Sequence, residues 1–286
     1  MRTQLWLLYE KQFDVGLSPI PWSMARHCGP YGVSFDILFI EYFSIIEDEL
    51  YYKGVASPTP PFNVFFRGYD LQLSRWFEKR GIRVINSSNA MASCKDKWAT
   101  YKLVLETNIP QPLTIVSKPT HSFSQVSSIV GSPFIAKDRY GMKGQGVYLI
   151  DSETMFDSLQ PITGDFSNYL FQEYVSSSHG KDCRVYIAGD TIIGAILRNN
   201  QNDFRANISQ GGTFSDYPIS AALREASLEI SRVLGAEVVA IDFLFGENGF
   251  VFCEANTNAG FHSFNKLGYQ TTSVIMDYIC NKVVLV

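Results

Sequence analysis

The amino-acid sequence predicts a mixed α/β fold, in which an α/β part is followed by α+β parts. Over roughly the first ninety residues, apolar runs of strand length, such as Gln4 to Tyr9 and Arg83 to Ile85, alternate with helical patterns such as Asp70 to Lys79. This alternation is typical of a small open α/β sheet. In the second half, strand-like runs follow one another as in an antiparallel sheet, and Ala221 to Leu234 is the clearest helical pattern.

The composition describes a compact protein. The chain has 286 residues, of which 46% are hydrophobic and 18% are charged, so it is long enough to bury one large core or several smaller ones. The net charge of -4 and the dispersed Lys and Arg residues argue against nucleic-acid binding. Five widely separated cysteines without metal-binding spacing indicate a reduced, cytoplasmic protein, and no apolar run has the length of a membrane span.

The middle of the chain predicts a smaller unit. A helix is expected from Asp96 to Glu106, where Pro110 and Pro112 follow it. Short strands are expected at 114–116, 134–137 and 148–150, with a serine-rich stretch between the first two that fits a short helix.

The two apolar runs 238–245 and 250–258, joined by a Gly-Glu-Asn-Gly connection, predict a β-hairpin. Each run carries a carboxylate, Asp242 in the first and Glu254 in the second. Buried carboxylates need a cation or donors, and Asn256, on the same strand face as Glu254, would complete an all-oxygen site for a hard divalent metal. Taken alone, the hairpin equally allows two carboxylates that face solvent at strand ends.

A lysine at the end of a strand, Lys137, precedes the glycine-rich segment 138–147. Glycines let backbone N–H groups approach phosphate oxygens, and a lysine adds a point charge. The segment matches neither the phosphate loop that ends in Gly-Lys-Ser/Thr nor the dinucleotide fingerprint, because it returns to a strand at Val147. In isolation the pattern favours an ordinary hairpin loop.

Further polar groups follow in a fixed order. The strand end Gln172-Glu173-Tyr174-Val175 could present backbone groups to a purine edge, with an acidic residue further on for ribose hydroxyls. Arg184 and Arg198 lie on adjoining predicted strands, and the segment 203–207 contains Arg205 and Asn207. Arginine binds both oxygens of a carboxylate or phosphate, although surface arginines commonly have no such role.

In this order, the motifs resemble those of the ATP-grasp superfamily. They are a lysine, a glycine-rich loop, Gln-Glu-Tyr, arginines, Phe-Arg-x-Asn, Gly-Gly-Thr, and finally Asp and Glu-x-Asn on a hairpin. Within the superfamily the chain is similar to the RimK-like carboxylate–amine ligases, the branch that includes the ribosomal-protein glutamate ligase. The resemblance extends from about Arg67 to Phe261.

The resemblance assigns roles to individual residues. It implies that ATP is bound by Lys97, Lys137, Glu173, Tyr174, Val175, Asp182, Arg205, Ala206 and Asn207, with Asp182 at the ribose. The residues that it places at the reacting groups are Arg184, Arg198, Arg205 and Asn207. Magnesium, as two ions and with Mn²⁺ as an alternative, would be held by Asp242, Glu254 and Asn256.

The resemblance also implies an architecture and a reaction. It divides the chain into an N-terminal α/β domain (1–92), a central lid (93–176) and a metal-binding domain (177–286), with ATP between the last two. The expected enzyme phosphorylates a carboxylate with ATP and joins the acylphosphate to an amine. The expected partners are ATP with small acid and amine substrates or an acidic peptide, without nucleic acid or membrane, and a homo-oligomer is left open.

The sequence departs from the family in two places, of which the second leaves the acceptor open. The turn after the metal-binding asparagine reads Asn258-Ala259-Gly260-Phe261 and lacks the usual proline, and residues 1–66 do not match the ribosomal-protein ligase closely. One alternative is a ligase that cross-links side chains of a ribosomally made precursor peptide. The other is an ATP-binding regulatory module without turnover, for which the loss of a metal ligand would be the signature.

Overall fold

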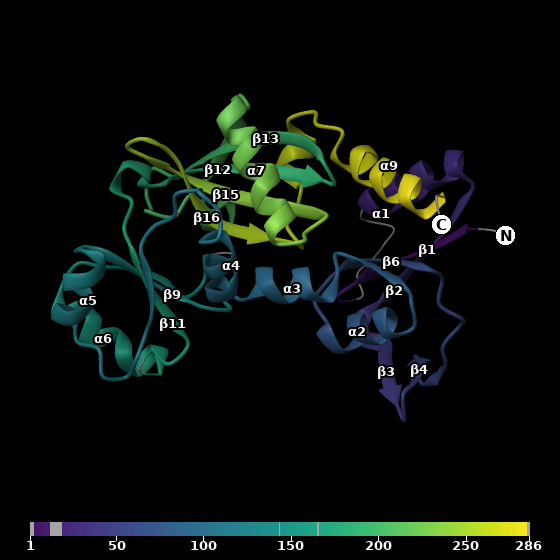
Figure 1. The fold of residues 1–286 in the computed structure, drawn as a ribbon, viewed down its shortest axis with the longest axis horizontal. Coiled ribbons are helices and arrows are strands. Elements are labelled where there is room, and N and C mark those ends of the chain that lie inside the picture. The colour runs from purple at the N-terminus through teal and green to yellow at the C-terminus, as the bar shows by residue number, and fades with distance from the viewer. Residues whose placement is uncertain (1–2, 12–18, 143, 165, 285–286) are drawn as a thin grey trace.

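A computed structural model describes residues 3–11, 19–142, 144–164 and 166–284, arranged around three larger sheets and one small sheet (Figure 1). The first sheet is parallel, with the order β2-β1-β6-β7. Its strands are β1 (Thr3–Tyr9), β2 (Val33–Phe39), β6 (Asn63–Arg67) and β7 (Arg83–Ile85). The predicted open α/β sheet is confirmed. A small antiparallel sheet of β3 (Phe43–Ile46), β4 (Glu49–Tyr52) and β5 (Val55–Ala56) extends from it.

Both faces of the parallel sheet are covered. Along β1, Leu5 and Leu7 point to the face of helix α1 (Pro19–Cys28), whereas Trp6 and Leu8 point to the face of helix α2 (Leu71–Lys79). This alternation follows from the two-residue repeat of a strand. Helix α2 begins where the Asp70 carboxylate accepts a hydrogen bond from the backbone N–H of Leu73 at 2.9 Å.

Two short helices connect this unit to the rest of the chain. The expected helix from Asp96 to Glu106 is confirmed as α4 (Lys97–Val104), and a second helix that was not predicted, α3 (Ser88–Lys95), precedes it. Each helix has its own N-cap, because Ser87 accepts from Ala90 N and Asp96 accepts from Trp98 N and Ala99 N. The cap at Asp96 interrupts the run, and Figure 1 shows the pair bridging the two ends of the molecule.

The second large sheet, called the lid sheet because it lies in the segment 93–176 that is expected to form the lid, is antiparallel, with the order β10-β9-β11-β8. Its strands are β8 (Thr114–Val116), β9 (Phe134–Asp138), β10 (Val147–Ile150) and β11 (Tyr169–Glu173). Helices α5 (Phe123–Val130) and α6 (Glu153–Thr163) pack on it through a cluster of buried aromatic rings, Phe134, Phe156, Phe166 and Phe171 (Figure 1). Helix α6 was not predicted, and a proline, Pro161, lies inside it.

The third sheet is antiparallel, as predicted, with the order β14-β13-β12-β15-β16. Its strands are β12 (Lys181–Ala188), β13 (Thr191–Asn199), β14 (Thr213–Asp216), β15 (Val238–Gly246) and β16 (Gly249–Asn256). Helix α7 (Ala221–Val233) packs on one face, while α8 (His262–Lys266) and α9 (Thr271–Val284) contribute to the core on the other face. Helix α9 lies beside α1, so the last helix joins the third sheet to the first (Figure 1).

The buried side chain of Asn86 ties the first sheet to the third. Its Oδ1 accepts from the backbone N–H groups of Glu237 at 2.6 Å and Val238 at 2.8 Å. Its Nδ2 donates to the carbonyls of Val238 at 2.8 Å and Thr257 at 3.4 Å. One amide thereby satisfies backbone groups at the start of β15 and just after β16, the two strands of the predicted hairpin.

We expect Asn86→Ala to lower the free energy of unfolding by about 3 kcal/mol or more, because each buried backbone group left without a partner costs about 1–3 kcal/mol. Urea unfolding followed by circular dichroism measures the change. Asn89→Ala, the same substitution at an exposed position nearby, is the matched control. Equal stability of the two variants would contradict this role for Asn86.

Candidate active site

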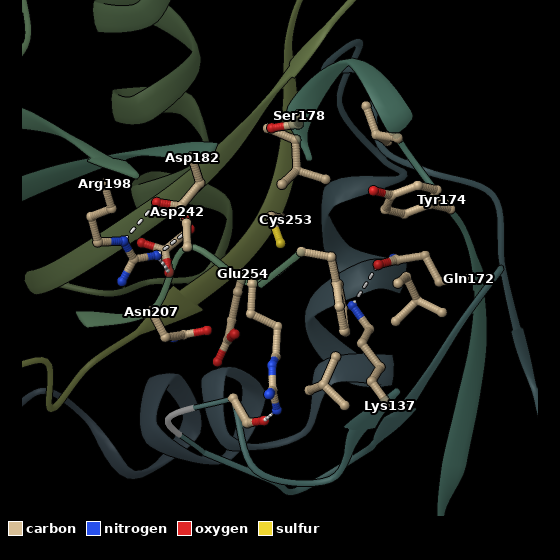
Figure 2. Close-up of a pocket in the computed structure, with 18 of the residues that line it drawn as sticks. Lys137, Gln172, Tyr174, Ser178, Asp182, Arg198, Asn207, Asp242, Cys253 and Glu254 are labelled. Atoms are coloured by element: carbon tan, nitrogen blue, oxygen red, sulfur yellow. Dashed lines mark hydrogen bonds and ion pairs between the residues drawn. The ribbon is translucent and has the colours of Figure 1, made fainter. Parts of the chain in front are cut away.

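A single pocket brings the predicted residues together, between the lid sheet and the third sheet. Its empty volume, including the part open to solvent, is about 870 Å³, which is within the range of small-molecule sites. All the residues predicted from the sequence line this pocket except Arg184 and Asn256. Figure 2 shows charged residues of the third sheet at one end of the pocket and residues of the lid sheet at the other.

The charged end is built from two carboxylates and two guanidinium groups on adjacent strands. Arg184 lies directly across from Asp242, and Asp182 lies directly across from Arg198. Arg184 binds Asp242 through Nε–Oδ1 at 2.6 Å and Nη2–Oδ2 at 2.7 Å. Arg198 binds both oxygens of Asp182 and also reaches Asp242 Oδ2 at 2.8 Å. Arg184 therefore does not line the pocket itself but supports Asp242 from behind.

The environment shifts the pKa values of the two carboxylates in opposite directions. Burial alone would raise the pKa of Asp242, but its contacts with Arg184 and Arg198 outweigh burial and hold that pKa below its usual value. Asp182 has one close guanidinium and feels the negative charge of Asp242, so burial prevails and raises its pKa. Because both oxygens of Asp182 are bound by Arg198, the predicted ribose contact would have to share them.

A β-bulge places Glu254 beside Asp242. From Gly246 and Gly249 the two hairpin strands pair regularly up to Phe243 and Phe252, and the register then shifts so that Asp242 lies across from Glu254. Cys253 is the extra residue of this bulge. With regular pairing, Cys253 rather than Glu254 would lie across from Asp242. The bulge therefore brings the two carboxylates to one side, a role that bulges commonly have near functional sites.

The rest of the predicted metal set fits less closely. Asn256 lies across from Ala240, two pairs further along the hairpin, and is not among the residues that line the pocket. Within the described ranges, no group of three or more His, Cys, Asp or Glu residues is arranged to hold a metal ion. The donors present are two facing carboxylates, with the amide oxygen of Asn256 on the same strand as Glu254, which is the oxygen chemistry that Mg²⁺ prefers.

The first predicted lysine, Lys97, faces Glu254. Its Nζ lies 4.0 Å from Glu254 Oε1 and also donates to the carbonyl of Gly141 in the glycine-rich segment. Lys97 is the first residue of α4, and its backbone N–H donates to Arg139 O at 3.1 Å. The helix start is held there because Arg139 binds the Asp96 cap through Nε–Oδ1 at 2.6 Å.

The second lysine, Lys137, is buried at the lid end of the pocket. Its Nζ donates to Gln172 Oε1 at 2.9 Å, and Gln172 Nε2 donates to Thr114 Oγ1 at 2.7 Å (Figure 2). The amide of Gln172 is thereby fixed in orientation by groups on both sides. Burial lowers the pKa of Lys137, and the nearby Lys97 acts in the same direction.

The strand end that follows Gln172 also lies at the pocket. Glu173, Tyr174 and Val175 line the pocket where the chain leaves β11. Glu173 Oε2 accepts from the backbone N–H of Leu113 at 3.1 Å, and the hydroxyl of Tyr174 contacts Nδ1 of His179. The segment is therefore a partly exposed strand end at the pocket, as was expected of the segment that could present backbone groups to a purine.

The glycine-rich segment meets the segment 203–207 across the pocket. Arg205 Nη1 donates to the carbonyl of Gly144 at 2.9 Å, while its other nitrogens bind Asp203. Gly144 has a φ of +75°, and a Cβ there would lie 2.8 Å from Asn207 Oδ1, so glycine is required for this approach. Residue 143 of this segment lies outside the described residues. The contact closes one wall of the pocket.

Sequence reasoning missed the apolar walls. Ile135, Met142, Val147, Phe204 and Leu244 line the pocket between its two polar ends. Such surfaces suit a flat aromatic ring. The available signal was strand alternation, because Ile135 and Lys137 lie on the same face of β9 and both face the pocket.

A comparison with protein families matches residues 94–279 to the RimK-like ATP-grasp domain, and this range contains every pocket residue. The chain belongs to the RimK-like ATP-grasp family.

Relatives of this RimK-like chain include named synthases and ligases. It is 31% identical to beta-citrylglutamate synthase B of Danio rerio over 73% of the chain and 53% of that protein. It is 28% identical to N-acetylaspartylglutamate synthase A of Homo sapiens, over 97% of the chain and 76% of that protein. It is also 28% identical to a probable alpha-L-glutamate ligase of Vibrio cholerae, over 83% of each. The chain thus spans about half the length of the Danio rerio relative.

Solved structures show the same fold. A RimK domain ATP-grasp protein from Sphaerobacter thermophilus superposes on the chain with a TM-score of 0.73 and 17% identity. The superposition covers 96% of this chain and 99% of the Sphaerobacter protein. The ATP-grasp ligase PsnB, in complex with a precursor variant, Mg and ADP, covers 98% of both chains at a TM-score of 0.73 and 16% identity. The predicted ATP-grasp fold is confirmed. No helix in the described part of the chain combines the length and apolar character needed to span a bilayer.

Proposed function

We propose that this protein is an ATP-dependent carboxylate–amine ligase that uses Mg²⁺. The observation that carries this proposal is one pocket with Lys97 and Lys137 on one side and the facing Asp242 and Glu254 on the other. ATP with magnesium is the characteristic ligand of the ATP-grasp fold, and the PsnB structure holds Mg and ADP. The same pocket would place the nucleotide between the lid (93–176) and the metal-binding domain (177–286).

Each polar group that lines the pocket has a role that its position supports. The apolar walls would hold the adenine, with backbone groups of Glu173 to Val175 at its edge, and the two lysines would contact the phosphates. Asp242, Glu254 and Asn256 would hold the metal, as two ions with Mn²⁺ as an alternative. Bound metal would offset the charge of the phosphates.

The remaining groups would act on the phosphates and the acid. Arg205, Ala206 and Asn207 would close over the nucleotide from the wall that they share with Gly144. Arg198 lines the pocket and is held in place by Asp182, and its guanidinium would contact the phosphates. Arg184 would act through Asp242, to which it is bound by two hydrogen bonds.

The proposed reaction has two balanced steps. A carboxylate oxygen of the acid attacks the γ-phosphorus of ATP, the bond to the β-phosphate oxygen breaks, and ADP leaves. The amine nitrogen then attacks the acyl carbon, the bond to the phosphate oxygen breaks, and phosphate leaves as the amine loses a proton. The chain would position the two substrates and supply fixed positive charge, because Lys97, Lys137 and Arg198 line the pocket.

We further propose that the amine substrate is L-glutamate or a peptide with an N-terminal amino group. The support is that the three curated relatives named above are a citrylglutamate synthase, an acetylaspartylglutamate synthase and a glutamate ligase. These names share glutamate, while the acid differs between them. The acid substrate is therefore the part of the reaction that a screen has to find.

The test is a phosphate-release screen with Mg·ATP, L-glutamate and a panel of acids, including citrate, N-acetyl-L-aspartate and short acidic peptides. Mass spectrometry identifies the product. We expect ADP and phosphate to form in equal amounts with one amide bond for at least one acid. ATP binding without release of phosphate for any acid, amine or precursor peptide would instead support a regulatory module.

We expect Gln172→Met to raise the KM for ATP by about tenfold while kcat changes less. The substitution removes the acceptor that holds Lys137, and a hydrogen bond to a charged group contributes about 1.5–3 kcal/mol. Initial rates over a range of ATP concentrations measure the change. Gln72→Met, at an exposed position of α2, is the control. An unchanged KM for ATP in Gln172→Met would show that Lys137 does not need this partner.

A further inference from the structure

The parallel sheet has a topological switch point outside the pocket already described. The chain leaves β1 through α1 on one face of the sheet and leaves β6 through α2 on the other. Strands β1 and β6 are neighbours, and their last paired residues are Tyr9 and Arg67. The helices that follow these adjacent strands pack on opposite faces, and the carboxyl edge at such a switch point is where open α/β sheets bind ligands.

Arg67 lies at this switch point, and part of its guanidinium group makes no hydrogen bond. Its Nη2 donates to the carbonyl of Ala259 at 3.0 Å, and its centre lies 5.1 Å from the ring of Phe261 and 6.0 Å from that of Phe65. Its Nε and Nη1 are buried and have no hydrogen-bond partner among the described residues. None of the ion pairs found in the described ranges includes Arg67.

A buried guanidinium with unused N–H groups is costly unless an anion meets it. The rings of Phe65 and Phe261 contact the guanidinium cation. They do not accept the hydrogen bonds that its N–H groups donate in the plane of the guanidinium. Each unmet donor carries a desolvation cost, and a charged group carries more. The planar fork of arginine matches a carboxylate, whose two oxygens accept two parallel hydrogen bonds.

The loop that Arg67 contacts links it to the proposed reaction site. Ala259 belongs to the chain that leaves the metal-binding hairpin after Asn256, and its carbonyl also accepts from the hydroxyl of Tyr186 at 2.9 Å. Arg67 is not part of the nucleotide pocket, so it does not serve the ATP phosphates. Arg67 lies between the switch point of the first sheet and the loop that follows the metal-binding hairpin.

We propose that Arg67 binds a substrate carboxylate that does not react, at the switch point of the N-terminal sheet. This inference rests on the proposed ligase function, because it assigns to that reaction a second anionic group. The carboxylate has two sources, the amino acid or an additional acid group of the phosphorylated substrate. Either source makes Arg67 a specificity-determining residue for substrates that carry a carboxylate besides the one that is phosphorylated.

The decisive variant is Arg67→Gln, which keeps an N–H donor for the Ala259 carbonyl and removes the charge. We expect the KM for one carboxylate substrate to rise about 10- to 100-fold, with the KM for ATP unchanged and kcat changed less. Arg67→Lys, which restores the charge, should recover part of the loss. Separate titrations of L-glutamate and of the acid found in the screen identify which of the two carries the carboxylate.

Two outcomes would overturn the proposal. One is an Arg67→Gln enzyme in which the KM values for both carboxylate substrates stay within about twofold of the parent, and the other is an equal rise in the KM for ATP. If the parent protein turns over no acid, the ligase proposal fails, and calorimetry with Mg·ADP and L-glutamate or citrate then decides the Arg67 proposal separately. Binding of neither probe, or equal binding to the parent and Arg67→Gln, would refute the carboxylate site.

Discussion

Glu254→Gln is expected to reduce ligase turnover on the order of 10³-fold while the fold stays intact. The glutamine has nearly the same shape but lacks the negative charge that a magnesium ion needs. The structure favours this single change because Glu254 is partly exposed and its only described ion pair, with Lys97, spans 4.0 Å. Little stability depends on it, since exposed and distant pairs contribute about 0–1 kcal/mol. Phosphate release with Mg·ATP and a competent substrate pair measures the loss.

The control for this prediction lies in the same hairpin. Glu247 is exposed in the turn between β15 and β16, so Glu247→Gln makes the same chemical change away from the pocket. We expect its turnover to match that of the parent. Adding Asp242→Asn to Glu254→Gln should abolish activity, but that change also releases two arginines and is expected to destabilise the protein. Persisting turnover in the double variant would refute the assignment of the metal ligands.

The strands that build the site were predictable because their sequences are strongly apolar and end in turn residues. Several helices were not, and α9 shows why. Its buried positions come in pairs one helical turn apart, such as Ile275 with Met276 and Ile279 with Cys280, but the first pair is Thr271 with Thr272. Buried threonines weaken the apolar signal, and the helix is fixed by packing between two sheets that are distant in sequence.

The register of the strands was the part of the site that the sequence could not supply. The turn at Gly189 and Asp190 indicates a hairpin, but regular pairing from that turn would place Asp182 across from Leu197. An irregularity between Tyr186 and Ile187 shifts the pairing by one residue and places Asp182 across from Arg198 instead. The irregularity at Asp242 does the same for Glu254. Bulges have no clear sequence signature, so the residues could be named while their pairing could not.

The second large effect is expected for Arg198→Met, which should lower the free energy of unfolding by about 3–5 kcal/mol. Methionine fills much of the same space but leaves Asp182 buried without the arginine that binds both of its carboxylate oxygens. Asp242 would keep Arg184. For a chain of this size the loss corresponds to a fall in Tm of about 6–20 °C, which differential scanning calorimetry measures.

The physical cause can be separated from simple loss of packing. Arg224→Met, at an exposed position of α7, controls for the substitution itself and should leave the Tm within about 2 °C. Adding Asp182→Leu to Arg198→Met removes the stranded carboxylate, so part of the lost stability should return, because the cost comes from an unpaired buried charge rather than from the missing attraction. If the double variant is less stable than Arg198→Met alone, packing rather than charge controls this site. If stability recovers and turnover does not, the buried ion pair of Arg198 and Asp182 is needed for catalysis rather than for stability.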